Sequence, residues 1–417
     1  MKPAAKVNKQ AVERCLREPM LFNWILLLFL ILTPLPSSAL YLHETENSYL
    51  NVTALGRVYA LYHDNPEGTL LYDDSTTSGL AGIARLIGQG ETASGLRYDF
   101  NIYQTVIPQK MAAAASSVTS IERSDLFEWS FHDSDYQHLA IDQLYLGWNS
   151  AKTSLRIGRQ PINLATNYYF TPNDLFAPFS AQTFYRTYKA GVDGIRVDHS
   201  LNDFSQFTFI SVLGYQTDTG SDSGWSNSID TDRSSHLIRY TASRYGLEWN
   251  LFTGQLKGEA ITGGGFQGEL TNYIGMRSEI QHYQQPGQTE AHIKAAFGLD
   301  RRWDNTIHLR GEVFYNGSGH DQVSQYVAGN NYLAVRYFTV GMSYEFTPLF
   351  NGDLLLLNNI DDDSSLIALN GLYSLGDESE LNLGIAIPFG KDPTLTTIHS
   401  EYGSAPIAIS MEIRSYF

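Results

Sequence analysis

The chain closes with the stretch Ala405-Pro406-Ile407-Ala408-Ile409-Ser410-Met411-Glu412-Ile413-Arg414-Ser415-Tyr416-Phe417. Apolar residues occupy one parity of this stretch, and small or polar residues occupy the other. The apolar parity holds Ile407, Ile409, Met411, Ile413 and Phe417. Because successive side chains of a strand point to opposite faces, the stretch predicts a β-strand with one apolar and one polar face. A strand of a soluble sandwich alternates in the same way, but it rarely ends on a terminal aromatic residue.

The first 39 residues have the order of a secretory signal. Five basic residues come first, namely Lys2, Lys6, Lys9, Arg14 and Arg17. The apolar run Leu21–Leu32 follows, and the small residues Ser37-Ser38-Ala39 end the segment. We therefore predict that residues 1–39 are a signal peptide cleaved after Ala39. The alternative is a retained anchor helix, but the apolar run is short for crossing a bilayer.

Removal of this segment leaves 378 of the 417 residues (417 − 39), and they contain no cysteine because Cys15 is the only one. This excludes disulfides, thiolate metal sites and covalently attached haem, and we expect no cofactor. The remaining 23 basic residues (28 − 5) stand against 42 acidic residues (44 − 2), a net charge near −19. Such a balance argues against nucleic-acid binding and suits lipopolysaccharide that is bridged by divalent cations.

Segments with alternating polarity recur from residue 49 to the C-terminus. Clear examples are 96–103, 247–251, 337–346 and 381–387. Many run for about 10 to 13 residues, which is long for a soluble strand and suits a tilted span of a bilayer. Beyond residue 39 no apolar run is long enough for a transmembrane helix, and aromatic residues make up 13% of the chain. A membrane protein without such helices must close its backbone hydrogen bonds as a barrel, with Tyr and Phe at the interfaces.

The connections between these segments alternate between short and long. Short turns are expected at 91–94, 150–152, 200–203, 245–246, 303–305, 347–353 and 376–379. Longer polar connections are expected near 62–78, 108–137, 161–188, 215–234, 317–331 and 390–404. Short periplasmic turns and long outer loops are the asymmetry of a bacterial barrel. We predict an all-β protein with one transmembrane antiparallel barrel over residues 40–417, in which 40–48 is a periplasmic lead-in. The expected count is about 18 strands, and 16 is the alternative because 246–283 is ambiguous.

Two elements carry a resemblance to outer-membrane β-barrel porins. The terminal strand resembles the closing strand of bacterial outer-membrane barrels, which the barrel-assembly machinery reads. That resemblance implies an assembly signal formed by Met411, Ile413, Tyr416 and Phe417. The strand end Leu155-Arg156-Ile157-Gly158-Arg159-Gln160 resembles that of substrate-specific porins, and the block 138–200 is similar to porin-like proteins of anaerobic delta-proteobacteria. The resemblance implies an integral protein of the bacterial outer membrane that contacts lipid and lipopolysaccharide, and a homotrimer is compatible with it.

A barrel of this strand number is wide enough to hold an aqueous lumen. The expected function is therefore passive diffusion of small hydrophilic solutes, and we expect no enzyme activity. The connection 163–187 is rich in aromatic residues and is expected to fold inward as an eyelet. Charged residues would then face each other across a constriction that favours small anions or carboxylates. They are Arg156, Arg159, Arg186, Lys189 and Arg196, with Asp174, Asp193 and Asp198. The alternative interpretation is that these charges bond neighbouring strand ends and only fix the loop.

Other motifs carry less weight. The cluster Asp361-Asp362-Asp363 is a weak candidate for a calcium site, but it lacks the spacing of a calcium loop, so a solvated loop is preferred. The stretch Gly263–Gly268 matches G-x-G-x-x-G without a helix after it, and it is interpreted as a turn or bulge. The eleven histidines show no metal-ligand spacing.

Two functions of other classes are kept as alternatives. The first is a porin-like sheath of an electron conduit across the outer membrane. Its multihaem cytochromes would be partner chains, because this sequence has no Cys-x-x-Cys-His. The second, an outer-membrane hydrolase, is less favoured. The neighbouring residues that suit it are His138 with Asp142 and His199 with Asp198, and no serine arrangement accompanies either pair.

Overall fold

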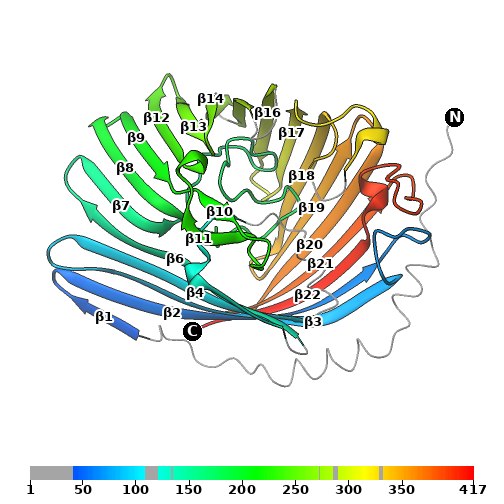
Figure 1. Ribbon diagram of the computed structural model, residues 1–417, viewed down its shortest axis with the longest axis horizontal. Helices are drawn as coiled ribbons and strands as arrows, with labels where there is room; N and C mark the ends of the chain where they lie inside the picture. Colours follow the sequence, from blue (N-terminus) through cyan, green and yellow to red (C-terminus); the bar gives the residue numbers. More distant parts are fainter. Residues whose placement is uncertain (1–40, 109–120, 133–134, 272, 285–289, 328–331) are drawn as a thin grey trace.

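The computed structural model describes residues 41–108, 121–132, 135–271, 273–284, 290–327 and 332–417. The predicted signal peptide, residues 1–39, lies outside this part of the chain. In the described residues the main sheet has 20 strands, and it closes on itself because β2 pairs with β22 (Figure 1). Within the same ranges, no helix is long and apolar enough to cross a membrane.

Two short strands of the sheet pair alongside one end of a longer strand, which leaves 18 (20 − 2) in the wall of the barrel. They are β1 (Tyr41–Thr45), which pairs with β2, and β5 (Glu128–His132), which pairs with β6. The wall strands are β2 (Ser48–Asp64), β3 (Thr76–Glu91), β4 (Leu96–Pro108), β6 (Asp135–Asn149), β7 (Thr153–Gln160), β8 (Val192–Asn202), β9 (Ser205–Val212), β12 (Ser235–Arg244), β13 (Leu247–Leu256), β14 (Glu259–Thr271), β15 (Ile274–Gln284), β16 (Ala291–Arg302), β17 (His308–Asn316), β18 (Arg336–Thr347), β19 (Phe350–Asn359), β20 (Ser364–Gly376), β21 (Ser379–Phe389) and β22 (Ile407–Tyr416).

The predicted closed antiparallel barrel is confirmed, and its strand number is 18 rather than the alternative of 16. The ambiguous stretch 246–283 contributes β13, β14 and all of β15 except its last residue. The segment 40–48, expected to be a lead-in, contains β1, which pairs with β2 in register from Tyr41 opposite Val52 to Thr45 opposite Ser48.

The two faces of the wall differ as the alternation predicts. Large apolar side chains on the outer face are exposed, among them Trp148, Phe209 and Leu251. The opposite parity is polar and buried, as at Asn250 of β13 and Thr339 of β18. An apolar band outside a polar interior, in a sheet without free edges, is the form of a transmembrane β-barrel.

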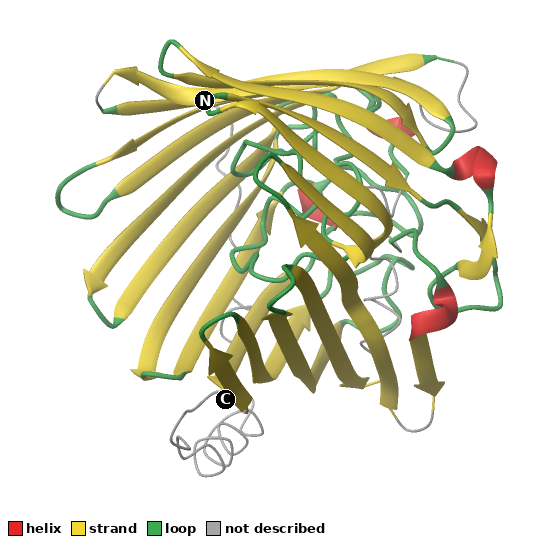
Figure 2. Ribbon diagram, turned by 90° about the vertical axis from the view of Figure 1, so that its left-hand side faces the viewer, coloured by secondary structure: helices red, strands yellow, loops and turns green. Residues whose placement is uncertain are grey.

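The two ends of the barrel also differ. Short turns join the strands at one end, and one of them is the two-residue turn Tyr245-Gly246, in which both residues have positive φ, as a tight hairpin requires. Long connections gather at the other end, and several of them enter the ring of strands (Figure 2). One such connection holds the small hairpin of β10 (Tyr215–Thr217) and β11 (Trp225–Ile229).

Candidate pore constriction

The connection between β7 and β8, residues 161–191, lies inside the barrel, and we call it the inner loop (Figure 1). Its contacts reach strands on the other side of the barrel. The Asn173 side chain donates to the carbonyl of Gly264 on β14 at 2.9 Å. Further along the loop, the Tyr185 hydroxyl lies 3.4 Å from that of Tyr416 on β22. The inner loop therefore lines the lumen far from the strands at which it starts and ends.

A carboxylate of β15 holds the first part of the inner loop. Glu279 is fully buried. It accepts the backbone N–H groups of Thr166 at 2.5 Å, Asn167 at 2.7 Å and Asn173 at 2.8 Å. This single side chain therefore fixes three loop residues.

A second carboxylate, on β17, holds the next residues in the same way. Glu312 is 1% exposed and accepts the backbone N–H groups of Tyr168 at 2.7 Å, Tyr169 at 3.0 Å and Phe170 at 2.9 Å. Within the described residues neither Glu279 nor Glu312 forms an ion pair. Both glutamates were missed at the level of sequence. The one sequence signal that could have found them is a charged residue at an inward-facing position of an alternating strand.

Aromatic packing supports these anchors. The Phe170 ring stacks on that of Phe314 with 4.9 Å between centroids, in a cluster that includes Tyr337. Gly341 of β18 leaves the space that the Tyr169 side chain occupies, because a Cβ at that position would overlap the phenol. The wall thus has a socket for this segment of the loop.

The predicted pair Arg159 and Asp193 lies in a buried junction. The Arg159 side chain is 1% exposed, and its Nε and Nη2 donate to Asp193 at 2.8 and 3.0 Å. Its Nη2 also donates to the carbonyl of Ser124 at 2.7 Å, and its Nη1 donates to that of Ile141 at 3.0 Å. All of these bonds go to other groups of the protein. Arg159 thus follows the alternative interpretation, in which the charges bond strand ends and fix the loop.

Two more predicted cations are used within the inner loop. Arg186 donates to the carbonyls of Thr183 at 2.9 Å and of Tyr168. Lys189 Nζ lies 2.5 and 2.6 Å from the two oxygens of Asp174. Burial raises the pKa of Asp174 and lowers that of Lys189, and each charge offsets the effect of burial on the other. These bonds shape the loop, and Arg186 also lines a cavity of about 160 Å³.

The two remaining predicted cations belong to a row of arginines on the inner face, which we call the arginine belt. Its members are Arg156 (β7), Arg196 (β8), Arg239 (β12), Arg277 (β15) and Arg310 (β17). Arg196 binds Asp198 through two bonds of 2.8 and 2.9 Å. Arg156, Arg239 and Arg310 form no ion pair within the described residues. Of the predicted residues, Arg156, Arg196 and Asp198 therefore lie together, whereas Arg239, Arg277 and Arg310 were missed.

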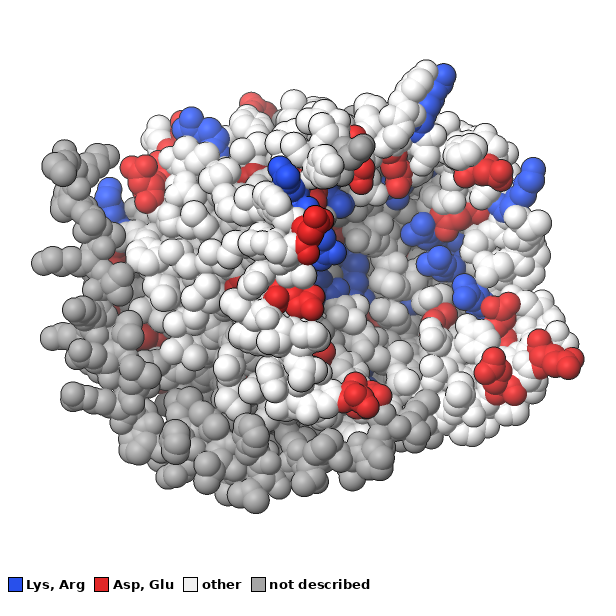
Figure 3. Space-filling view, turned by 180° about the vertical axis from the view of Figure 1, so that it is seen from behind, with Lys and Arg blue, Asp and Glu red and all other residues white. Residues whose placement is uncertain are grey.

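The opposite wall carries arginines whose charge is compensated. Arg57 of β2 binds Glu412 at 2.6 and 2.9 Å, and Arg414 of β22 binds the same carboxylate at 2.7 Å. Both guanidinium groups also lie over the ring of Tyr185, at 5.0 and 3.9 Å. In Figure 3 basic side chains gather around a hollow, with acidic ones at its margin.

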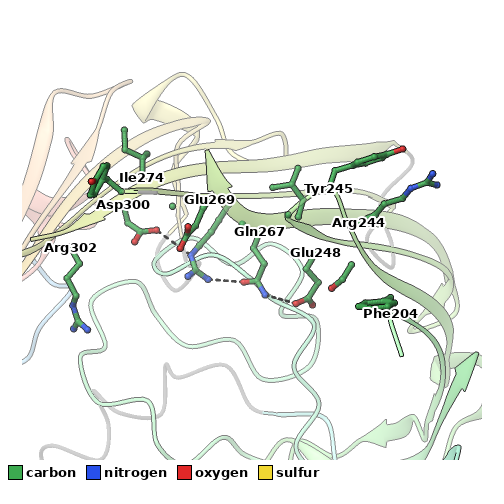
Figure 4. A pocket seen from close by; sticks show the side chains of 16 residues that line it. Phe204, Arg244, Tyr245, Glu248, Gln267, Glu269, Ile274, Asp300 and Arg302 are labelled. Carbon is green, nitrogen blue, oxygen red and sulfur yellow. Dashed lines mark hydrogen bonds and ion pairs between the residues drawn. The ribbon is translucent and has the colours of Figure 1, made fainter. Parts of the chain in front are cut away.

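A cavity of about 900 Å³ opens at the short-turn end of the lumen (Figure 4). A chain of contacts runs along its wall. Gln267 donates to Glu248 at 3.1 Å and accepts from Arg277 at 3.0 Å, and Arg277 Nε lies 3.8 Å from Asp300. Glu269 and Arg302 also line the cavity. Its lining is therefore of mixed charge, and part of the arginine belt faces it.

The acidic cluster of residues 361–363 binds backbone groups. Asp361 accepts the N–H groups of Val335 at 2.9 Å and of Arg336 at 2.8 Å, and Asp362 accepts that of Glu401 at 2.7 Å. Nowhere in the described ranges do three or more His, Cys, Asp or Glu side chains come close enough together to hold a metal ion. The first two carboxylates of the cluster thus connect neighbouring loops.

Glu401 itself anchors the connection 390–406. Its carboxylate accepts the Tyr337 hydroxyl at 2.6 Å and the Asn359 amide at 2.8 Å. Burial raises the pKa of Glu401 to about 7. This carboxyl is therefore partly protonated at neutral pH.

The residue pairs considered for a hydrolase do not form. His138 hydrogen-bonds Ser130 at 3.0 Å, while Asp142 binds Arg85 and Arg123, each at 2.9 Å. His199 bonds Thr153 at 2.9 Å, and Asp198 is engaged by Arg196 as described. The sequence neighbours thus have separate structural partners.

The C-terminal residues predicted as an assembly signal complete the barrel. Met411, Ile413 and Tyr416 lie in β22 and pair with Ala60, Val58 and Leu55 of β2. The Phe417 N–H donates to the Ala54 carbonyl at 2.8 Å, and the Ala54 N–H donates back at 2.9 Å. This is the seam at which the sheet closes.

Comparison with known proteins places the fold. No protein-family model and no curated protein sequence matches the chain. Among solved structures, Acinetobacter baumannii OccAB2 matches at a TM-score of 0.55 and 12% identity, over 88% of this chain and 98% of that one. OccAB1 of the same organism matches at 0.55 and 11%, over 92% and 99%. Pseudomonas aeruginosa OccK9 (OpdG) matches at 0.55 and 11%, over 88% and 98%. The chain shares the barrel fold of these proteins. They lend no support to the narrower likeness to delta-proteobacterial proteins.

Proposed function

We propose that this chain is an outer-membrane porin through which small hydrophilic solutes diffuse passively. The observation that carries the proposal is a closed 18-strand barrel whose inner loop is anchored to the far wall. A loop held in this way narrows the lumen without a separate plug domain. The apolar outer face would lie in lipid, with the short turns toward the periplasm and the long loops toward lipopolysaccharide.

The proposal includes a preference for small anions or carboxylates. Two arginines of the belt, Arg156 and Arg239, have no acidic partner at ion-pair distance in the described residues. Uncompensated charges in a confined aqueous path raise the local concentration of ions of opposite sign. The carboxylates Glu248 and Glu269 at the short-turn mouth favour cations instead, so the net ion selectivity has to be measured.

The inner loop also bears on the sheath alternative. It occupies lumen space that a multihaem cytochrome would need, so the pore is the function that we favour.

The test is single-channel conductance of refolded residues 40–417 in planar bilayers, with the reversal potential measured under a salt gradient. We expect steady open conductance and a reversal potential of the sign of anion selectivity. A folded barrel, identified by its heat-modifiable migration, that does not conduct would contradict the pore. A cation-selective current would keep the pore and remove the anion preference.

A further inference from the structure

Tyr168 of the inner loop lies against two arginines of the belt. The guanidinium carbon of Arg277 is 4.1 Å from the centroid of its ring, and that of Arg310 is 5.2 Å from it. Arg277 Nη2 also donates to the Tyr168 hydroxyl at 2.9 Å. The Tyr168 backbone is fixed by Glu312, and the ring meets His308 edge-on at 5.8 Å between centroids. The phenol therefore has a defined position between these two cations.

The charge of Arg310 has little compensation where it stands. Its Nε donates to His308 Nδ1 at 3.3 Å, which requires that nitrogen to carry no proton and the imidazole to be neutral. Its other bonds go to the hydroxyls of Ser343 and of Tyr169, which are also neutral. Asp353 is reached only through Ser343, whose hydroxyl donates to it at 2.5 Å.

The charge of Arg277 is also only loosely compensated, because its Nε is 3.8 Å from Asp300. Both arginines are half-buried and lie beside open space. Arg277 lines the cavity of about 900 Å³ at the short-turn end. Arg310 and Tyr168 line a second cavity, of about 160 Å³. Each arginine thus lines a cavity itself, and the Tyr168 ring covers one side of both guanidinium groups.

We propose that Tyr168 is a selectivity-determining residue, because its ring covers Arg277 and Arg310 and withdraws part of their charge from passing ions. The inference rests on the proposed pore function. A ring over a guanidinium face excludes water and ions from that face, and the contact itself stabilises the arrangement. Without the ring, hydrated anions could approach both guanidinium groups.

Tyr185 provides a matched control on the same loop. Its ring also lies over two arginines, Arg57 and Arg414, at 5.0 and 3.9 Å. In contrast to Arg310, both bind carboxylates directly, through Glu412 and, for Arg414, also Glu380 at 3.2 Å. Removal of the Tyr185 ring would uncover charges that are already neutralised.

The experiment compares reversal potentials of Tyr168→Leu and Tyr185→Leu barrels under a potassium chloride gradient. We expect the chloride-to-potassium permeability ratio to rise roughly two-fold in Tyr168→Leu, because two charges become accessible, and to stay at the wild-type value in Tyr185→Leu. The double variant Tyr168→Leu/Arg310→Gln should lose at least half of the rise. An unchanged ratio in a conducting Tyr168→Leu barrel, or an equal rise in Tyr185→Leu, would overturn the inference.

A further measurement covers the case in which Tyr168→Leu does not fold. With Tyr168 in place, Arg310→Gln should leave the permeability ratio nearly unchanged, because its charge is covered. A large fall in anion permeability in this variant would show that Arg310 already meets the passing ions, and would overturn the role of Tyr168. A folded wild-type barrel without any conductance would remove the pore itself, which is a different failure.

Discussion

At the scale of single residues, two arginines that are close together in the sequence differ in whether they can act on solutes. Arg156 and Arg159 stand three residues apart in the same strand end, with Gly158 between them. Arg156 lies on the inner face without an ion pair in the described residues, whereas Arg159 is buried against Asp193. Gly158 has φ +126°, and a Cβ there would meet the carbonyl of Leu144. The positive φ therefore interrupts the regular alternation of the strand between the two arginines.

The two arginines should respond differently to substitution. Arg159→Met leaves the buried Asp193 carboxylate without its cation, and breaking such a pair costs on the order of 3–5 kcal/mol of folding free energy. Arg156→Gln should change the free energy of unfolding by less than about 1 kcal/mol, because the side chain that it replaces is half-exposed and forms no ion pair in the described residues. Conversely, only Arg156→Gln should lower anion permeability.

The measurements are urea unfolding of the refolded barrels in detergent and reversal potentials of those that insert. A stable Arg159→Met barrel with reduced anion permeability would show that this arginine faces the lumen after all. The sequence indicated that the strand end Leu155–Gln160 brings charged residues to the candidate site. It could not show that Arg156 lies on the inner face while Arg159 is buried. These positions depend on one left-handed φ value and on contacts with Ser124 and Ile141.

At the scale of elements, the position of the inner loop depends on the two buried glutamates of the far wall. Glu279→Gln/Glu312→Gln replaces carboxyl groups, in which both oxygens accept, with amides that offer one acceptor oxygen each. Each hydrogen bond contributes about 0.5–1.5 kcal/mol and several are lost together, so the loop should detach or become mobile in the double variant. The closed wall should persist, because strand pairing does not use these side chains.

This prediction can be read from one spin label, because residues 40–417 contain no cysteine. Gln182 of the inner loop is exposed, so a label at Gln182→Cys reports loop mobility. The label should become more mobile in the double glutamine variant and stay unchanged in Glu248→Gln. That control removes an inward carboxylate that binds Gln267 and not the loop. Equal mobility in all three proteins would show that other contacts hold the loop.

The sequence supported an inward aromatic loop but could not supply its anchors. Glu279 is 113 residues from Thr166, and Glu312 is 144 residues from Tyr168. Alternation reports which face of a strand a side chain is on, and it carries no information on which loop will meet that face. The ambiguity of residues 246–283 has a related cause. The glycines 263–265 of β14 have no side chains to alternate, and they sit where Phe252, Leu251 and neighbouring carbonyls come close.

At the scale of the whole molecule, alternation and connection lengths were sufficient for the closed antiparallel barrel, because each observation constrains every strand at once. Parity requires an even strand number when both ends of the barrel wall lie on the same side. What closes the ring physically is the pairing of β2 with β22, from Asp64 opposite Ile407 to Leu55 opposite Tyr416. The bonds between Phe417 and Ala54 continue that seam by one residue.

Two variants separate closure of the seam from recognition of its last residue. Deletion of Phe417 removes two backbone hydrogen bonds, each contributing about 0.5–1.5 kcal/mol, and should lower the heat-modification midpoint of the refolded barrel. Phe417→Leu keeps both bonds and should refold like the wild type in detergent. If the aromatic ring is what the barrel-assembly machinery reads, Phe417→Leu should still assemble poorly in cells. Normal assembly of Phe417→Leu in cells, together with a weakened deletion variant, would assign the role of Phe417 to the seam alone and contradict the assembly signal.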